Sequence, residues 1–267
     1  MSKKILFILL LISSVNYAQL SNKHWLPPLH SRSSTVVQEH YIYLSTPETT
    51  PIQVTVTDGS GTPIAGSPFT ISQGNPHSEL IGVTQPSLMM LNQSDLNIAK
   101  IDKGLILEST GEFYASFRLL AQNHAEILVC KGRNGAGTAF RLGSLPMTEP
   151  GSIRNFVASF MATEDNTTVV LNEYDTEIVF ASGSGNILDD TQTFNLNAGE
   201  SVTVSGYTDF GANLSGFIGA LLTSNKPIVV NTGNATGGML GAGDGQDLNL
   251  DQIVPVDIVG DEYIVVK

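Results

Sequence analysis

Apolar residues along this chain come in short runs that either alternate with polar residues or continue for a few positions. The runs are rich in β-branched and aromatic residues, and clusters of glycine, proline, asparagine and aspartate separate them. Such runs predict β-strands, because strand side chains alternate between two faces and turn residues reverse the chain. Candidate strands run over 41–45, 52–57, 69–72, 105–109, 113–120, 127–131, 156–162, 168–172, 177–181, 193–196, 201–205, 216–223, 228–231 and 263–266. The pattern predicts an all-β fold of sandwich or barrel type.

Segments of the second half resemble segments of the first half in the same order. The matched pairs are 41–48 with 156–165, 69–74 with 194–199, 104–109 with 219–224, and Leu145-Pro146 with Val254-Pro255. The spacing within the pairs varies only by loop-sized amounts, which is typical of a tandem repeat. We therefore predict two related β-sandwich-like modules, over 35–150 and 151–267. Chance similarity between β-rich segments is the alternative.

The N-terminus has the pattern of an export signal. Lys3 and Lys4 precede an apolar run over 5–12, and the small residue Ala18 stands before Gln19. The run is shorter than the roughly 20 residues that span a bilayer. We predict a signal peptide over 1–18, cleaved near Ala18, then a leader over 19–34 and a secreted or bacterial cell-surface location. An uncleaved anchor is the alternative.

The last residues, 261–267, read as the start of a further strand. We therefore expect the second module to be truncated at its C-terminal end and the chain to be the front of a larger protein.

Charge and cysteine content narrow the function. The chain has 13 lysines and arginines against 25 aspartates and glutamates, a formal net charge of −12. An acidic surface without a basic patch repels phosphate backbones and anionic lipids, so we expect no nucleic-acid partner and no membrane insertion of the mature chain. Cys130 is the single cysteine, which leaves no internal disulfide. Its strand-like surroundings predict a small buried side chain rather than a reactive thiol.

The sequence contains no recognisable catalytic motif. It has no Gly-x-Ser-x-Gly elbow, no His-Glu-x-x-His motif and no phosphate loop ending in Lys-Ser/Thr. His24 and His30 could meet in space, but two histidines in a loop more often face solvent or bond to a turn than bind a metal. Glu164 and Asp175 are candidates for a glycosidase pair, yet nothing in the sequence brings them together. We therefore predict no enzyme activity.

A glycine-rich stretch over 232–245 follows the candidate strand 228–231. The helix that a nucleotide-binding loop requires does not follow it, so we predict a long mobile loop without a nucleotide cofactor. Carboxylate oxygens are ligands that calcium prefers, which makes Asp244 and Asp247 a candidate calcium site. The alternative is that these acids form turns and keep the loop solvated. We predict no other cofactor.

Three segments near the C-terminal end carry a family resemblance. They are Asn225-Lys226-Pro227-Ile228-Val229-Val230-Asn231-Thr232-Gly233-Asn234, then Asp247-Leu248-x-x-Asp251-Gln252-x-x-Pro255, then Gly260-Asp261-Glu262-Tyr263-Ile264-Val265. This order resembles the N-terminal domain of IgGFc-binding proteins, with "Ser-x-Lys-Pro-Ile-x-Val … Gly-Asn", "Asp-His-Leu-x-Glu-Gln-x-Pro-Pro" and "Gly-x-x-Phe/Tyr-x-Val" segments. The resemblance covers roughly 110–267 and is most specific over 216–266.

The chain departs from that family pattern at three positions. Leu248 stands where the family often has histidine, Asp251 replaces the usual glutamate, and Val256 replaces the second proline. These departures weaken the transfer of any specific binding activity. The resemblance implies adhesion or surface binding rather than antibody binding in particular, and it brings no catalytic residues. Proteins that look like this are common in gliding bacteria, at the front of surface proteins that resemble type IX secretion cargo.

These observations together predict a non-catalytic extracellular adhesion or ligand-binding module. The expected partner is a surface protein or a glycan of a host or neighbouring cell. A structural spacer within a surface protein is the alternative, and a carbohydrate-active enzyme ranks last. Because binding residues concentrate on loops, we place the candidate ligand site on the 233–252 loop and on the acidic turn at the same end of the second module. Its residues are Asn234, Asp247, Asp251, Gln252 and Asp165.

Overall fold

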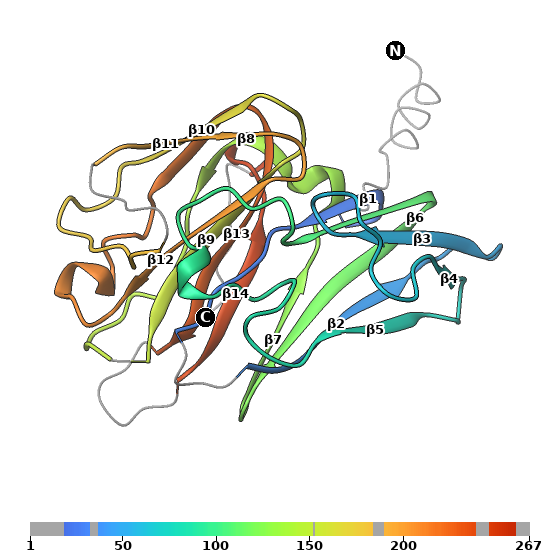
Figure 1. Cartoon of the computed structure of the whole chain (residues 1–267), viewed down its shortest axis with the longest axis horizontal. Helices are drawn as coiled ribbons and strands as arrows, with labels where there is room; N and C mark the ends of the chain where they lie inside the picture. Colours follow the sequence, from blue (N-terminus) through green and yellow to red (C-terminus); the bar gives the residue numbers. More distant parts are fainter. Residues whose placement is uncertain (1–18, 33–36, 152, 184–189, 239–245, 260–267) are drawn as a thin grey trace, which may run out of the picture.

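The computed structural model, drawn in Figure 1, describes residues 19–32, 37–151, 153–183, 190–238 and 246–259. Within these ranges the chain forms β-strands and short 3₁₀ turns and no α-helix, which confirms the all-β prediction. The first seven strands are β1 (Ser21–Leu26), β2 (Val37–Ser45), β3 (Ile52–Thr57), β4 (Phe69–Ile71), β5 (His77–Gly82), β6 (Leu105–Ala121) and β7 (His124–Val129). The next seven are β8 (Ala136–Arg141), β9 (Asn155–Ala162), β10 (Thr167–Asn172), β11 (Gln192–Leu196), β12 (Ser201–Tyr207), β13 (Leu221–Gly237) and β14 (Asp247–Ile253). The predicted signal peptide, Asp244 and the candidate strand 263–266 lie outside the described residues.

Strands β1–β7, which we call module one, are organised around β6. The first half of this 17-residue strand pairs antiparallel with β3 and β1, and its second half pairs with β2 and β7. β4 extends the sheet beyond β3, and β5 extends it beyond β2. One long strand therefore runs through two four-stranded layers, β4-β3-β6-β1 and β5-β2-β6-β7.

Strands β8–β14, which we call module two, repeat this arrangement. The order β4-β3-β6-β2-β5 of module one becomes β11-β10-β13-β9-β12, and β8 and β14 pair with β13 as β1 and β7 pair with β6. The two layers of module two are β11-β10-β13-β8 and β12-β9-β13-β14. Every pairing of module one has its counterpart, so the prediction of two related tandem modules is confirmed.

The strand register supports two of the matched segment pairs exactly where the sequence placed them. Val54 pairs with Phe69 and Ser109, while Val169 pairs with Phe194 and Ser224. The matches of 69–74 with 194–199 and of 104–109 with 219–224 therefore align equivalent strands.

The other two matches need correction. Leu44 pairs with Ala115 in module one, and Phe160 pairs with Val230 in module two. The register therefore makes Leu44 and Phe160 equivalent, which shifts the predicted alignment of 41–48 with 156–165 by one residue. A shift of one residue exchanges the two faces of a strand, so the alignment matters. The match of Leu145-Pro146 with Val254-Pro255 is wrong, because the first follows β8 and the second follows β14.

The predicted module boundaries stay predictions. The strand pairing adds that β1, inside the predicted leader, belongs to module one, and that β8, before residue 151, belongs to module two.

Several strand predictions also need correction. Residues 177–181 form no strand, because Phe180 makes only an isolated bridge to Gly206. β13 begins at Leu221 rather than at 216. It continues with an irregular register through Asn225-Lys226-Pro227, so the candidate strands 216–223 and 228–231 belong to one long strand. In the same way, the candidate strands 105–109 and 113–120 are both part of β6. The sequence analysis missed β1, β5, β8 and β14. Two of them carry buried polar side chains that interrupt the apolar pattern, Ser21 and His24 in β1 and Gln252 in β14.

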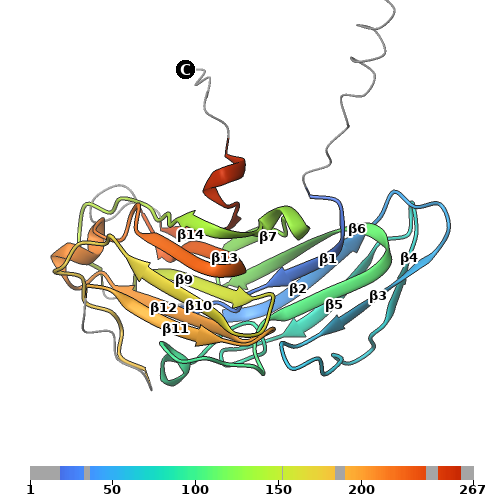
Figure 2. The same ribbon diagram turned by 90° about the horizontal axis from the view of Figure 1, so that it is seen from above.

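The modules meet along a buried junction, which Figure 2 shows with β7 lying beside β14. Each module has its own apolar core, but Val157, Leu248 and Leu250 of module two belong to the core of module one. A third, smaller cluster of Trp25, Met161 and Val229 lies between the modules. The junction therefore buries apolar surface from both modules, which favours a fixed arrangement of the two.

Candidate functional site

The described ends of the predicted loop over 232–252 are strands, while residues 239–245 lie outside the described residues. Thr232 to Gly237 belong to β13, and Asp247 to Ile253 form β14, which pairs with β13. Gly233 adopts φ +138, and a Cβ there would stand 1.9 Å from the carbonyl oxygen of Asn249. Glycine is required at this point for the close approach of two backbones and not for mobility.

Gln252 is buried at the junction of the modules. Its Oε1 accepts a hydrogen bond of 2.6 Å from the Lys131 backbone N–H, and its Nε2 donates one of 2.9 Å to the Trp25 carbonyl oxygen. Asn231, also fully buried, donates to the Pro27 carbonyl oxygen at 2.8 Å. These side chains satisfy backbone groups that module one presents to module two, so they hold the modules together.

The remaining residues of the predicted ligand loop also have structural contacts. Buried Asn234 accepts a hydrogen bond from the Leu145 backbone N–H, which ties the connection between β8 and β9 to β13. Exposed Asp251 lies 3.2 Å from Lys131 Nζ, across the junction. Asp165 accepts a bond from the Ala198 backbone N–H within module two.

The sequence analysis placed Asn234 and Asp165 at the same end of module two, but they lie at opposite ends of β9. Asn234 pairs with Phe156 at the start of β9, whereas Asp165 follows the end of that strand. An eight-residue strand spans roughly 25 Å, so the two residues cannot share one small ligand.

The calcium hypothesis rests on Asp247 alone within the described residues. Its Oδ1 lies 3.4 Å from His124 Nδ1 of module one and accepts the Leu248 backbone N–H at 2.9 Å. The part of the chain that the structure describes contains no cluster of three or more histidine, cysteine or acidic residues that could hold a metal ion. Calcium at Asp244 and Asp247 stays a prediction.

The candidate glycosidase pair is not assembled. Glu164 precedes β10 and Asp175 follows it, so a whole six-residue strand separates them. Both side chains are exposed, and Asp175 Oδ1 accepts the Glu177 backbone N–H in a local turn. A glycosidase needs its carboxylates about 5–9.5 Å apart, so this pair does not form a catalytic site.

His24 and His30 are both buried, so neither faces solvent, which was one of the two expected alternatives to a metal site. His24 is fully buried with Nε2 2.9 Å from the Phe113 carbonyl oxygen, and His30 lies with Nδ1 2.9 Å from the Leu91 carbonyl oxygen. Burial lowers the pKa of both rings below the usual 6.5 and keeps them neutral. Cys130 is buried as predicted, and burial raises the pKa of its thiol to about 12.

An exposed surface with several apolar residues lies on the solvent side of the β5-β2-β6-β7 layer. Leu80, Tyr41, Arg118 and Ile127 stand next to one another in a single row across the four strands. Tyr43 stands in the adjacent row with its ring 6.2 Å from that of Tyr41. Ile127, Leu80 and Tyr43 are 55%, 43% and 37% exposed. We call these five residues the open face; sequence reasoning did not select them, although the alternation of Tyr41 and Tyr43 with buried neighbours could have indicated it.

Module two has an equivalent face, and that face is covered. A row of four paired residues crosses β12-β9-β13-β14 at the position that the open-face row occupies in module one. It consists of Ser205, Val157, Gly233 and Leu250. All four residues are buried, and Val157 and Leu250 pack in the core of module one. The same face of the repeat is therefore an intramolecular contact surface in module two and a solvent-exposed surface in module one.

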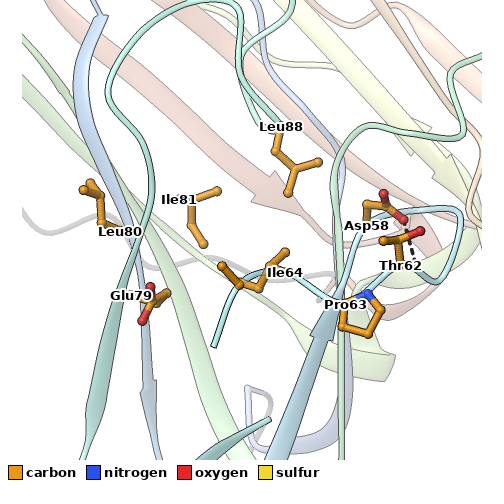
Figure 3. Close-up of a pocket in the computed structure, with 9 residues that line it drawn as sticks. Asp58, Thr62, Pro63, Ile64, Glu79, Leu80, Ile81 and Leu88 are labelled. Atoms are coloured by element: carbon orange, nitrogen blue, oxygen red, sulfur yellow. Dashed lines mark hydrogen bonds between the residues drawn. The ribbon is translucent and has the colours of Figure 1, made fainter. Parts of the chain in front are cut away.

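A small pocket of about 290 Å³ adjoins the β3–β4 connection (Figure 3). Ile64, Ile81 and Leu88 gather in it, and Asp58 lies at its edge. Asp58 Oδ1 accepts hydrogen bonds from the backbone N–H groups of Ser60 and Thr62, so this carboxylate is held in its own turn. Glu79 also lines the pocket, and its Oε2 lies 3.1 Å from His77 Nε2, so both carboxylates at the pocket have a partner.

Comparisons with known proteins agree with the resemblance of the C-terminal segments. A family model described as IgGFc binding protein matches residues 126–267, slightly more than half of the chain. That description names a binding activity rather than a reaction. No curated protein and no solved structure matches the chain. No helix in the described part is long and apolar enough to cross a membrane.

Proposed function

The chain belongs to the IgGFc binding protein family, and on this premise we propose that it is a non-catalytic extracellular module that binds a partner protein through the open face. The partner is a surface protein of a host or neighbouring cell, and the chain acts as the adhesive front of a bacterial surface protein exported by its signal peptide. Delivery by type IX secretion and an association with gliding motility belong to the same proposal.

One observation carries the proposal: the open face is the counterpart of a surface that already binds protein within this chain. In module two the corresponding row is covered by module one, and in module one it is exposed. The row contains tyrosine and arginine, which are enriched at the centre of protein interfaces. They stand beside the exposed aliphatic side chains of Leu80 and Ile127, and apolar side chains grouped on one exposed face favour an interaction site.

The experiment measures binding of the full chain to immobilised immunoglobulin Fc, the probe that the family description names, and adhesion to a layer of epithelial cells. The double variant Tyr41→Ala/Tyr43→Ala should weaken binding at least tenfold, because hot-spot aromatic residues each contribute about 2 kcal/mol or more. Ile218→Ala, which truncates a 41% exposed side chain of module two, should bind like the unaltered chain.

Two results would overturn the proposal. Equal binding by the double variant would show that the open face is not the contact surface. Failure of the unaltered chain to bind either Fc or cells would favour the structural spacer.

A further inference from the structure

A polar cleft of about 570 Å³ lies where the segment after β1 meets the end of β12, away from the open face. His30, Ser31 and Arg32 line it from module one, and Tyr207 lines it from module two. Gln85, Asn92, Gln93 and Ser94 complete the wall, so the lining contains no aliphatic side chain. Its volume falls within the range of small-molecule sites.

Once the hydrogen bonds within the cleft wall are made, more acceptor atoms than donor groups are left without a partner among the described residues. His30 Nδ1 faces the Leu91 carbonyl oxygen at 2.9 Å, and a carbonyl only accepts, so the neutral ring carries its proton on Nδ1 and Nε2 is an acceptor. The Tyr207 hydroxyl lies 3.3 Å from that Nε2 but donates its single proton to Gln93 Oε1 at 3.0 Å. His30 Nε2 therefore receives no proton from Tyr207.

Arg32 Nη1 in the cleft wall makes no regular hydrogen bond but pairs with Asp209 at 2.7 Å. Two further polar atoms there lack a partner among the described residues. They are Oε1 of Gln85 and the hydroxyl of Ser31, a residue that is 1% exposed. Gln85 is oriented by its Nε2, which donates to the Ser31 carbonyl oxygen at 2.9 Å. A buried polar group without a partner is unfavourable by about 1–3 kcal/mol, so a ligand that supplies donors here recovers that energy.

The charges in the cleft balance one another. Arg32 lies 2.7 Å from Asp209 and stacks over the Tyr207 ring, with Cζ 4.2 Å from the ring centroid. Burial keeps His30 neutral by lowering its pKa, and it raises the pKa of the Tyr207 hydroxyl. The cleft therefore attracts neither a phosphate nor a carboxylate strongly, and an uncharged ligand fits it best.

We propose that this cleft binds an uncharged carbohydrate of one or two sugar rings, whose hydroxyl groups donate to His30 Nε2 and Gln85 Oε1 and bond to the Ser31 hydroxyl. Sugar hydroxyls both donate and accept, which matches this mixed wall. A peptide supplies N–H donors as well, but its aliphatic side chains would find no aliphatic partner in the lining of the cleft. The site goes beyond the proposed function, because it shares no residue with the open face.

The experiment applies the full chain to an array of immobilised neutral and acidic glycans. Ser31→Ala removes a hydroxyl that bonds to no described residue, so the fold should keep its melting temperature while glycan binding falls at least tenfold. Gln85→Met removes the unpartnered acceptor and also the bond from Gln85 Nε2 to the Ser31 carbonyl oxygen, so its melting temperature is measured alongside its binding, which should fall by a similar factor. Ser78→Ala on β5, at an exposed position, is the matched control and should bind like the unaltered chain.

Three outcomes would overturn the proposal: no neutral glycan is retained, Ser31→Ala retains glycans fully, or only acidic glycans are retained. The Tyr41→Ala/Tyr43→Ala variant should keep glycan binding, and Ser31→Ala should keep Fc and cell binding, so the two proposals can fail separately.

Discussion

Cys130 follows β7 with only 1% of its surface exposed, and burial raises the pKa of its thiol to about 12. The thiolate is the reactive form of cysteine, so the folded protein holds almost none of it at neutral pH. We expect Cys130 to resist alkylation by iodoacetamide in the folded chain and to react rapidly in urea, as followed by mass spectrometry. Rapid modification of the folded chain would show that the region around β7 opens readily.

His24 couples the stability of module one to pH. Burial lowers the pKa of its ring below 6.5, so the folded state binds a proton more weakly than the unfolded chain does. The contribution of His24 to the free energy of unfolding is therefore fully present above pH 6.5, and it is lost as the pH falls below that value. One such group changes the free energy of unfolding by at most about 1.4 kcal/mol per pH unit.

We therefore expect urea denaturation to show a free energy of unfolding that declines between about pH 7 and about pH 5, and less steeply in His24→Gln. The comparison uses the slope against pH, because loss of the ring contact with Phe113 lowers stability at every pH. Equal slopes in the two proteins would contradict the assignment.

At the scale of elements, β13 and β14 depend on the absence of a side chain at Gly233. A Cβ there would overlap the Asn249 carbonyl oxygen, and the φ of +138 is unfavourable for other residues. We expect Gly233→Ala to lower the free energy of unfolding by about 3 kcal/mol or more, measured by urea denaturation. Gly143→Ala is the control, because no atom lies within 4 Å of its Cβ position, and it should change stability by less than about 0.5 kcal/mol. Similar losses in both variants would contradict the close approach of the strands.

At the scale of the whole molecule, the junction makes the two modules one unit. Trp25, the single tryptophan, is buried between the modules, so its fluorescence reports the junction, while far-UV circular dichroism reports all strands. We expect both signals to change at the same urea concentration, which is the test for a two-state transition. Separate transitions would show that the modules unfold independently.

Gln252 is the polar residue on which we expect this coupling to depend most. Gln252→Ala leaves the Lys131 N–H and the Trp25 carbonyl oxygen unpaired in the buried junction, and we expect a loss of about 3 kcal/mol in the same assay. Asp251→Asn weakens only an exposed ion pair next to it and should cost less than about 1 kcal/mol. A larger loss in Asp251→Asn than in Gln252→Ala would reverse the assigned roles.

The sequence by itself determined the class of fold and its duplication. Alternating apolar positions identify strands such as β3 and the second half of β6, because burial of one face is a local pattern that repeats every second residue. The recurring glycines and aromatic residues, such as Phe69 and Phe194, also mark equivalent positions in the two modules.

Only the tertiary structure decided what the functional-looking residues do. Asp247, Asp251 and Gln252 read as a ligand loop, but their strand lies against β7, which no local pattern specifies. Likewise, Tyr41 and Val157 occupy equivalent positions in the two modules. Packing between the modules covers Val157 and leaves Tyr41 on the open face. Which face of a strand meets water depends on contacts between residues far apart in the chain, and a pattern along the sequence does not contain them.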